Sequence, residues 1–191
     1  MNLEQKGRLV VKHLRHDPHS LGFNSLLTGG YLPVDSLLNS IWKYKGVRIT
    51  RDELNEIVET NNKQRLSYDT TGTLIRANQG HSIPVDLQLT PETPPAVLYH
   101  GTDEKYVDSI NETGIYKSSR HAVHLSEDVH TAGKVGARHS GNPYVLGVDA
   151  EQMYKDGYLF YKSENGVWLT DFVPQGYLLR EEHGYEPIRF Y

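Results

Sequence analysis

A proline-rich break near the middle of the chain limits the folds open to this sequence. Residues 89–96 read Leu-Thr-Pro-Glu-Thr-Pro-Pro-Ala. Three prolines so close together can continue neither a helix nor a central strand. The segments on either side are each long enough to form a small domain with its own core. We therefore predict two lobes, residues 1–90 and 97–191, joined by a linker over residues 91–96.

The first lobe carries the pattern of three helices followed by a β-hairpin. Apolar residues at helical spacing predict three helices, at residues 3–14, at residues 33–44 and after the capping box Thr50–Glu53. Two strand-like runs flank a turn sequence and predict a hairpin, at residues 65–68 and 74–77. Three helices with a two-stranded wing indicate a winged-helix lobe. Such lobes often contact nucleic acid, although a fold alone does not prove a function.

The second lobe is dominated by short strand-like runs. They lie at residues 97–99, 122–125, 144–148 and 166–169. Two helices are predicted between them, at residues 105–113 and from Ser126 through Arg138. Strands with interspersed helices indicate an α+β fold class.

Composition excludes several classes of protein. The chain has no cysteine, which rules out disulfide scaffolds, thiolate metal sites and cysteine nucleophiles. No run of 18 apolar residues and no signal peptide is present, so we expect a cytoplasmic protein without membrane contact. The net charge of -4 argues against a broadly basic nucleic-acid surface. Compact clusters of arginine and histidine can still bind phosphate locally.

Two short basic motifs of the first lobe have both a structural and a functional interpretation. Arg15 and His16 end the first helix, where they either complement the helix dipole or form a compact phosphate-binding cluster. Lys63 and Arg65 begin the wing, where they either protect an edge strand or bind an anion. The polar stretch 76–82 directly follows a strand, a common position for a binding loop.

The second lobe has two further motifs. In the Tyr99–Thr102 stretch, Gly101 would allow a ligand to approach the backbone before the next helix begins. Residues 120–126 alternate as in a strand, which puts Arg120 and His124 on one face and His121 on the other. Because this spacing points the two histidines apart, we assign no metal site.

Taken in order, these motifs resemble the RNA 2′-phosphotransferase family, enzymes that use NAD to remove the splice-junction 2′-phosphate from ligated tRNA. The matching segments are residues 14–16, 63–65, 75–82, 99–102, Arg120 with 123–126, 134–138 and 164–170. Each motif is weak singly, but seven in the right order over two lobes are specific. The resemblance implies an N-terminal winged-helix RNA-binding lobe packed on a C-terminal NAD-binding lobe of the ADP-ribosyltransferase fold.

The resemblance also implies roles for individual residues. The catalytic residues it implies are Arg15, His16, Arg65 and Arg120. The NAD-binding residues it implies are His100, Gly101, Thr102, His124, Leu125 and Ser126. We further assign RNA contacts to Arg76, Gln79, His81 and Arg138.

The implied reaction has two steps and uses no metal. The RNA 2′-phosphate displaces nicotinamide from NAD, and the resulting ADP-ribosylated RNA then releases ADP-ribose 1″,2″-cyclic phosphate. The partner is RNA bearing a 2′-phosphate, with no obligate protein partner expected. Two alternatives stay open: an ADP-ribosyltransferase that modifies nucleic-acid phosphate ends or protein, and a non-catalytic winged-helix RNA-binding module.

Overall fold

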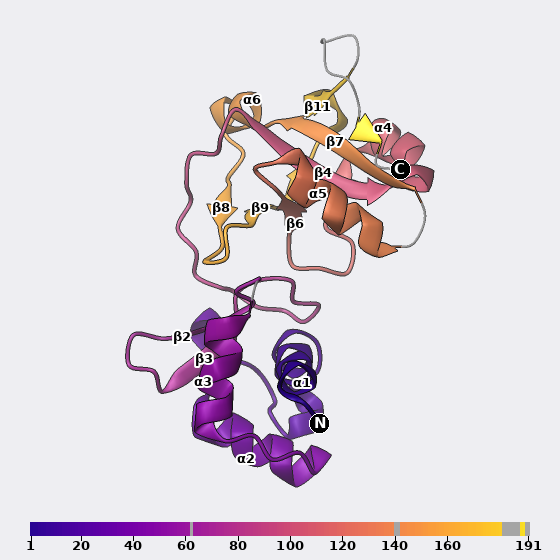
Figure 1. Ribbon diagram of the computed structural model, residues 1–191. Helices are drawn as coiled ribbons and strands as arrows, with labels where there is room; N and C mark the ends of the chain where they lie inside the picture. The colour runs from indigo at the N-terminus through magenta and orange to yellow at the C-terminus, as the bar shows by residue number, and fades with distance from the viewer. Residues whose placement is uncertain (62, 140–141, 181–187, 190–191) are drawn as a thin grey trace. The chain divides into compact units, whose positions relative to one another are not determined.

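The computed structural model describes residues 1–61, 63–139, 142–180 and 188–189. The chain divides into two compact units, Met1–Leu89 (unit 1) and Thr90–Tyr191 (unit 2) (Figure 1). Each unit has a hydrophobic core of its own. Among the described residues, no helix has the length and apolar character needed to cross a membrane.

Unit 1 contains the three helices that the apolar spacing predicts. They are α1 (Leu3–Arg15), α2 (Val34–Lys45) and α3 (Arg51–Thr60), with 3-10 turns η1 (His19–Leu21) and η2 (Thr28–Gly30) between α1 and α2. Their apolar faces meet in one core, whose fully buried members include Val10, Leu14, Leu37, Ile41 and Leu54. The helix predictions for this unit are therefore confirmed.

The predicted hairpin of unit 1 belongs to a three-stranded sheet. Its strands are β1 (Tyr31–Pro33), β2 (Leu66–Tyr68) and β3 (Leu74–Ala77), in the order β1-β3-β2 and all antiparallel. The hairpin prediction is confirmed, whereas β1 was not expected from the sequence. Pro33 is tolerated there because β1 is an edge strand.

The start of α3 is fixed by the capping box that the sequence predicts. Thr50 Oγ1 accepts a hydrogen bond from the Glu53 backbone N–H at 3.1 Å, and the Glu53 carboxylate accepts one from the Thr50 N–H at 2.9 Å. Lys6 Nζ of α1 donates to the same carboxylate at 2.6 Å. This Lys6 hydrogen bond is the main cause that lowers the pKa of Glu53. One side chain therefore caps α3 and ties it to α1.

Unit 2 consists of short strands and helices. The strands are β4 (Val97–Asp103), β5 (Ile115–Tyr116), β6 (Val123–Leu125), β7 (Pro143–Asp149), β8 (Tyr161–Lys162), β9 (Trp168–Thr170), β10 (Phe172–Val173), β11 (Leu178–Leu179) and β12 (Ile188–Arg189). The helices are α4 (Val107–Thr113), α5 (Val129–Gly136) and α6 (Ala150–Lys155). The 3-10 turns are η3 (Glu104–Tyr106), η4 (Ala137–His139) and η5 (Gln175–Tyr177).

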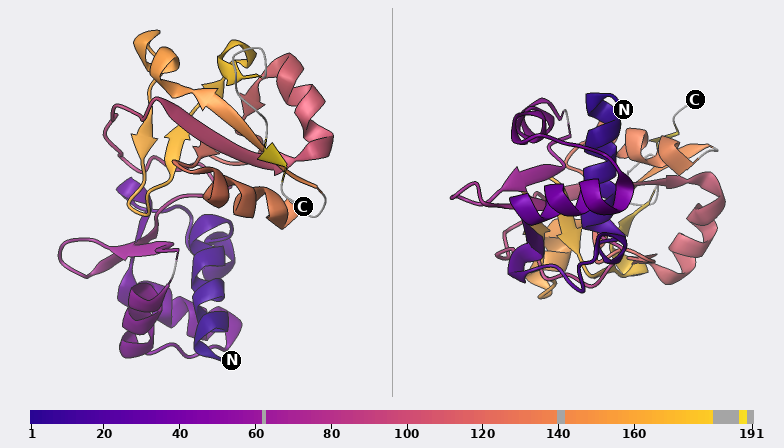
Figure 2. Two further views of the ribbon diagram at one scale, coloured as in Figure 1. Left: turned by 45° about the horizontal axis from the view of Figure 1, so that its top comes forward. Right: turned by 90° about the horizontal axis from the view of Figure 1, so that it is seen from below.

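The long pair β4 and β7 forms the centre of unit 2, with α5 lying alongside it (Figure 2). β7 also pairs with β11 and β12, while β6, β9 and β8 form a second sheet and β5 pairs with β10. A bridge between Tyr99 and Ser126 joins β4 to the end of β6. Every strand pairing within the described ranges is antiparallel. The chain is therefore a mixed α/β protein, in agreement with the predicted α+β class.

Two strand predictions for unit 2 need correction. The run predicted at residues 97–99 extends to Asp103, because all seven residues of β4 pair with β7, and Gly101 lies well inside this strand. Residues 120–122 form a bend, and β6 starts only at Val123. The strand alternation expected for Arg120 does not exist, since pairing with β9 covers only residues 123–125.

The segment expected to be a linker is attached to unit 2. Pro91 forms a β-bridge with Tyr161, and the Glu92 N–H donates to the Phe160 carbonyl at 2.8 Å. Pro94 is buried. These contacts give the proline-rich segment a fixed path along unit 2.

We expect Thr50→Ala to lower the free energy of unfolding by about 1 kcal/mol, because the Glu53 N–H loses its acceptor at the start of α3. Urea unfolding followed by circular dichroism measures this change. Thr60→Ala, at the other end of α3, is the matched control, since its hydroxyl donates to the Glu56 carbonyl of its own helix. Equal losses in the two variants would contradict a capping role for Thr50.

Candidate functional site

The basic motif at the end of α1 is held by a loop from a distant part of unit 1. The Ser82 N–H donates to the Arg15 carbonyl at 3.0 Å, and Ser82 Oγ lies 2.9 Å from His16 Nδ1 in a hydrogen bond. Gly80 has a φ of 85°, and a Cβ placed on it would lie 3.4 Å from Arg15 Cζ. Residues 78–82, here called the clamp loop, therefore bond to the backbone of Arg15 and to the ring of His16, and Gly80 lies beside the Arg15 guanidinium.

The clamp loop is anchored at its other end on the start of the hairpin. The Asn78 N–H donates to the Arg65 carbonyl at 2.9 Å, and Asn78 Nδ2 donates to the Gln64 carbonyl at 2.6 Å. Ser67 Oγ donates to Asn78 Oδ1 at 2.6 Å. Gln64 has a φ of 39°, an unfavourable left-handed conformation that the Asn78 bond helps to hold. One short loop thus bonds directly to the backbone at Arg15 and at Arg65.

Arg76, one of the residues assigned to RNA contact, has a structural position. It is 8% exposed, and its Nη1 donates to the carbonyls of Gly29 at 3.2 Å and Leu87 at 3.1 Å. Its guanidinium carbon lies 4.9 Å from the centre of the Tyr31 ring. Arg76 therefore joins three segments within unit 1.

The other residues assigned to RNA contact differ in exposure. His81 is fully buried in unit 1, Gln79 is half-buried beside it in the clamp loop, and Arg138 is exposed on η4 of unit 2. Contact of these residues with RNA stays a prediction.

Arg65 also lines a groove on unit 1. The groove has a volume of about 590 Å³, lies between α1 and α3, and includes the side chains of Lys63 and Arg8. Arg8 forms an exposed ion pair with Glu4 at 2.9 Å. An exposed pair of this kind contributes little stability, so Arg8 can exchange Glu4 for another anion at low cost. This wall of the groove is basic and faces solvent.

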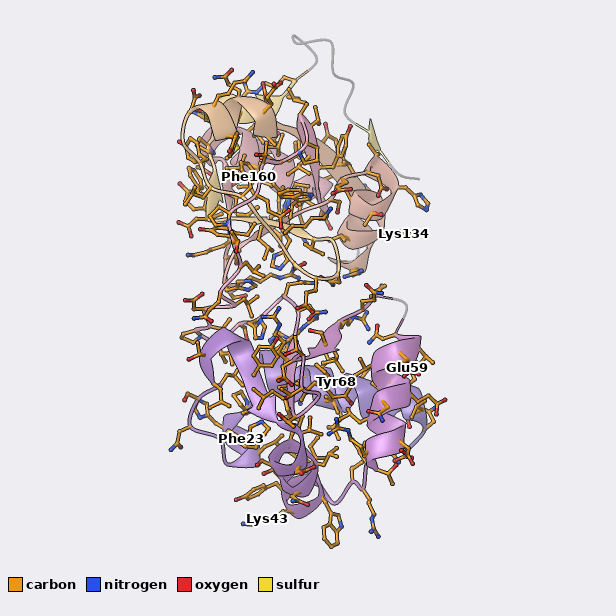
Figure 3. The ribbon with its side chains drawn as sticks, turned by 90° about the vertical axis from the view of Figure 1, so that its left-hand side faces the viewer. Phe23, Lys43, Glu59, Tyr68, Lys134 and Phe160 are labelled. Carbon is orange, nitrogen blue, oxygen red and sulfur yellow. The ribbon has the colours of Figure 1, made fainter. Side chains whose placement is uncertain are left out.

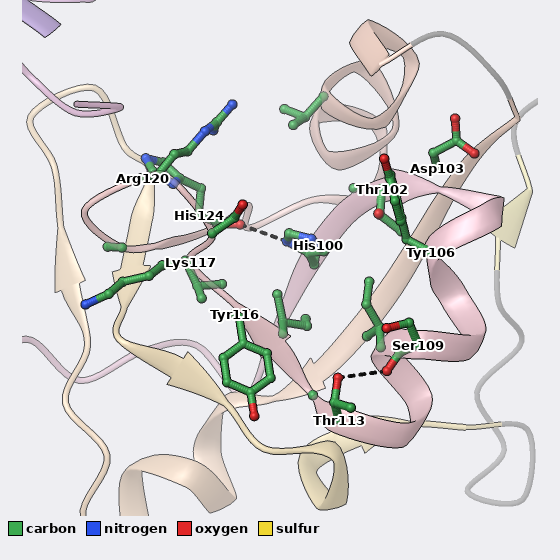
Figure 4. Close-up of a pocket in the computed structure, with 18 of the residues that line it drawn as sticks. His100, Thr102, Asp103, Tyr106, Ser109, Thr113, Tyr116, Lys117, Arg120 and His124 are labelled. Atoms are coloured by element: carbon green, nitrogen blue, oxygen red, sulfur yellow. Dashed lines mark hydrogen bonds between the residues drawn. The ribbon is translucent and has the colours of Figure 1, made fainter. Parts of the chain in front are cut away.

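Unit 2 has a cavity of about 500 Å³ beside β4 (Figure 4). His100 lies between two sides of it, with Arg120 and His124 on one side and Thr102 on the other. Gly101 contributes backbone to the lining. The structure therefore brings together Arg120 and four of the six residues assigned to NAD.

The remaining two residues assigned to NAD lie elsewhere. Leu125 is 1% exposed and packs in the core of unit 2. Ser126 exchanges two backbone hydrogen bonds with Tyr99, at 2.9 and 2.8 Å. Neither residue lines the cavity of Figure 4. Both support its wall by fixing β6 against β4.

Gly101 is required for a reason that differs from the one the sequence suggests. A Cβ placed on it would lie 1.8 Å from the Ala132 carbonyl oxygen and 2.9 Å from the Gly136 nitrogen, both in α5. A Cβ on Gly136 would in turn lie 2.7 Å from the Thr102 carbonyl oxygen. The close backbone approach that Gly101 permits is therefore that of a helix and not of a ligand.

The histidines of the cavity are oriented by their neighbours. His100 Nδ1 lies 3.2 Å from the His124 carbonyl oxygen, and because a carbonyl only accepts, this nitrogen carries the hydrogen. The His121 and His124 rings meet edge to face with centroids 5.6 Å apart. The prediction that these two side chains point apart is wrong, because residues 120–122 are a bend. Among the residues that the structure describes, no group of three His, Cys, Asp or Glu side chains could hold a metal ion.

The sequence interpretation gave no individual role to several polar and aromatic residues of these sites. Tyr106, Tyr116 and Lys117 line the cavity of unit 2, and Ser82 holds His16 in unit 1. Tyr116 and Lys117 follow Gly114, the residue that ends α4. An aromatic residue next to a lysine just after a helix-ending glycine is the sequence signal that could have identified them.

An ionic cluster holds the β8–β9 hairpin near the end of β6. Glu127 accepts hydrogen bonds from Lys162 Nζ at 2.7 Å and from Trp168 Nε1 at 2.8 Å. Both hydrogen bonds lower the pKa of Glu127, and the bond from Lys162 is the larger cause. The cluster joins the segment after Ser126 to the second sheet of unit 2.

Comparison with known proteins places the chain in a class. The family model described as RNA 2′-phosphotransferase, Tpt1 / KptA family, matches residues 2–172. A probable RNA 2′-phosphotransferase of Nostoc punctiforme is 57% identical over 171 residues, which cover 90% of this chain and 93% of that protein. A protein of the same description from Streptomyces coelicolor is 48% identical over 90% of this chain and 91% of its own length. The chain belongs to the RNA 2′-phosphotransferase family.

We expect Gly101→Ala to lower the free energy of unfolding of unit 2 by about 1–3 kcal/mol, because β4 and α5 must separate to admit the methyl group. Gly176→Ala is the matched control, since a Cβ there meets nothing within 4 Å. Thermal unfolding of both variants measures the difference. A Gly101→Ala protein as stable as the control would show that the β4–α5 contact is not tight.

Proposed function

We propose that this protein removes an internal 2′-phosphate from RNA and consumes NAD in the reaction. The observation that carries the proposal is the arrangement of Arg15 and His16, which the clamp loop holds side by side at the end of α1. A guanidinium group and an imidazole fixed in this way suit a phosphate, because their donors need no reorganisation when it binds. Membership of the RNA 2′-phosphotransferase family supports the same substrate.

The cavity of unit 2 fits a dinucleotide co-substrate. Its volume of about 500 Å³ lies in the range of small-molecule sites. Arg120 offers positive charge for a diphosphate, whereas Lys117 forms an ion pair with Asp171 at 2.7 Å. The exposed rings of Tyr106 and Tyr116 offer faces for flat heterocycles. Bound NAD would supply an activated ribose carbon with nicotinamide as the leaving group.

In the first step, Arg15 and Arg65 hold the RNA 2′-phosphate while one of its oxygens bonds to the ribose C1″ of NAD. The C1″–N bond breaks, and its electron pair leaves with nicotinamide. The nucleophile is already anionic, so no residue has to remove a proton from it. Positioning provides most of the acceleration.

In the second step, the ribose O2″ gives up its proton to solvent water and attacks the same phosphorus. The bond from phosphorus to the RNA 2′-oxygen breaks, and His16 is the proposed donor of the proton that converts this oxygen to a hydroxyl. Arg65 and Arg120 neutralise the charge that develops on the phosphate oxygens. The products are RNA with a 2′-OH and ADP-ribose 1″,2″-cyclic phosphate.

The finer fold and substrate assignments are also part of the proposal. The three helices followed by a hairpin in unit 1 support a winged-helix fold, and we propose an ADP-ribosyltransferase-like fold for unit 2. We propose splice-junction tRNA as the physiological type of substrate.

The deciding experiment incubates the protein with NAD and an RNA that carries one internal 2′-phosphate, without added divalent metal. We expect RNA with a 2′-OH, nicotinamide and ADP-ribose cyclic phosphate in equal amounts. Release of inorganic phosphate without loss of NAD would overturn the proposal in favour of a phosphatase. A persistent ADP-ribosylated product would indicate a transferase that stops at the adduct, and absence of NAD binding would indicate an RNA-binding module.

The two steps should separate in arginine variants. We expect Arg65→Ala and Arg120→Ala to slow the second step by about 10²–10³-fold, as for loss of a donor aimed at transition-state charge, and the first step less. ADP-ribosylated RNA should then accumulate as a retarded band in gels of single-turnover reactions. Arg51→Ala is the control, because it removes an exposed arginine of unit 1 that lines neither the groove nor the clamp loop. If the variants slow the first step as much as the second and no retarded band forms, these arginines act by binding the substrate phosphate and not by stabilising the transition state of the second step.

A further inference from the structure

The C-terminal end of α2 carries a surface that the proposed reaction does not use. Residues 42–48 read Trp-Lys-Tyr-Lys-Gly-Val-Arg, with three cations, two aromatic residues and no acid, in a chain whose net charge is -4. Trp42 is 61% exposed and Tyr44 48%. Lys43 lies on the outside of unit 1 at one of its ends (Figure 3). We call this surface the α2 platform.

Cations lie over both rings of the platform. The guanidinium carbon of Arg48 is 5.9 Å from the centre of the Trp42 ring, and Lys43 Nζ is 4.9 Å from that of Tyr44. Lysines at a helix C-terminus have an ordinary explanation, since they complement the helix dipole. That explanation does not extend to Arg48, which lies beyond the end of α2 at Lys45. Nor does it account for an indole left in solvent.

The platform lies close to the chain segment that directly follows α1. A Cβ placed on Gly22 would lie 3.1 Å from Tyr44 Oη. The pKa of Asp17 is lowered mainly by a hydrogen bond from Ser20, and the charge of Lys45 also contributes, so Lys45 acts on this carboxylate. The single negative charge of Asp17 offsets one of the three positive charges of the platform, those of Lys43, Lys45 and Arg48. The platform therefore remains positive and neighbours the end of α1 that carries the proposed phosphate site.

We propose that the α2 platform binds unpaired RNA, with a base stacked on Trp42 and phosphates on Lys43, Lys45 and Arg48. This inference rests on the proposed function for its choice of RNA as the partner. Aromatic rings with interleaved cations are the usual means of holding single-stranded nucleic acid, because every base has a π-face and every linkage a phosphate. An acidic protein would satisfy the cations but would leave the exposed indole without a flat partner.

The test uses RNA without a 2′-phosphate and without NAD, so its result does not depend on whether the protein removes phosphate. The chain has two tryptophans, and Trp168 is 3% exposed in unit 2, so a stacked base should quench Trp42 alone. We expect a single-stranded 12-nucleotide oligoadenylate to quench the fluorescence of the wild-type protein. The quench should be absent from Trp42→Phe, which keeps an aromatic ring at this position.

Affinity for the same oligonucleotide gives a second readout. We expect the double variant Trp42→Ala, Arg48→Ala to bind about 5- to 150-fold more weakly, the range for loss of one base–aromatic stack. The matched control is Tyr154→Ala, Lys155→Ala, which removes an exposed aromatic residue and a neighbouring lysine from α6 of unit 2. Heparin, a polyanion without bases, should compete for the cations without quenching Trp42.

Three results would overturn the proposal. The first is a double variant that binds the oligonucleotide as tightly as the control variant does. The second is quenching by heparin equal to that by RNA, which would reduce the platform to a charge effect. The third is tighter binding of a poly-glutamate peptide than of RNA, which would identify a protein partner. If instead the platform binds RNA and the deciding experiment on the 2′-phosphate fails, the proposed function falls and the RNA surface stands.

Discussion

The side-chain amide of Asn78 is the interaction on which the arrangement of unit 1 depends. It is 3% exposed, donates to the Gln64 carbonyl and accepts from the Ser67 hydroxyl. Through its backbone it also bonds to Arg65. Burial of an amide is costly unless its hydrogen bonds are made, and here each one ties the hairpin to the clamp loop. Because the clamp loop in turn bonds to the end of α1, a change at Asn78 would loosen both the start of the hairpin at Arg65 and the Arg15–His16 motif.

Unit 2 achieves the same rigidity by contact between backbones. Gly101 and Gly136 let β4 and α5 approach until no side chain can stand between them. A strand held this closely on one side and paired with β7 along its whole length has little freedom to move. His100 and Thr102, on the same strand, therefore face the cavity from a fixed backbone. The two units thus present polar side chains from rigid supports, by a loop in unit 1 and by a helix in unit 2.

The sequence predicts those parts of the structure whose signals are local. The capping box at Thr50 and the turn between β2 and β3 lie within a few residues of what they specify, and both predictions are confirmed. β1 was missed because a three-residue strand exists only through its pairing with β3. The hydrogen bond of Ser82 to His16 joins residues 66 positions apart, and the spacing of apolar residues along the sequence cannot predict such a contact. Gly101 was noticed for its lack of a side chain, but the sequence cannot say whether a ligand or a helix takes the space.

The low net charge of the chain and its compact basic sites have a common physical consequence. A protein with 24 acidic and 20 basic residues does not attract a polyanion over its whole surface. Attraction is then restricted to places where several cations lie together, and screening at physiological ionic strength limits its reach to about 8 Å. Discrimination among phosphates must therefore come from geometry at short range. At the proposed phosphate site, the packing of Gly80 beside Arg15 and the bond of Ser82 to His16 would supply that geometry, because donors already held in place lose little side-chain entropy when an anion binds.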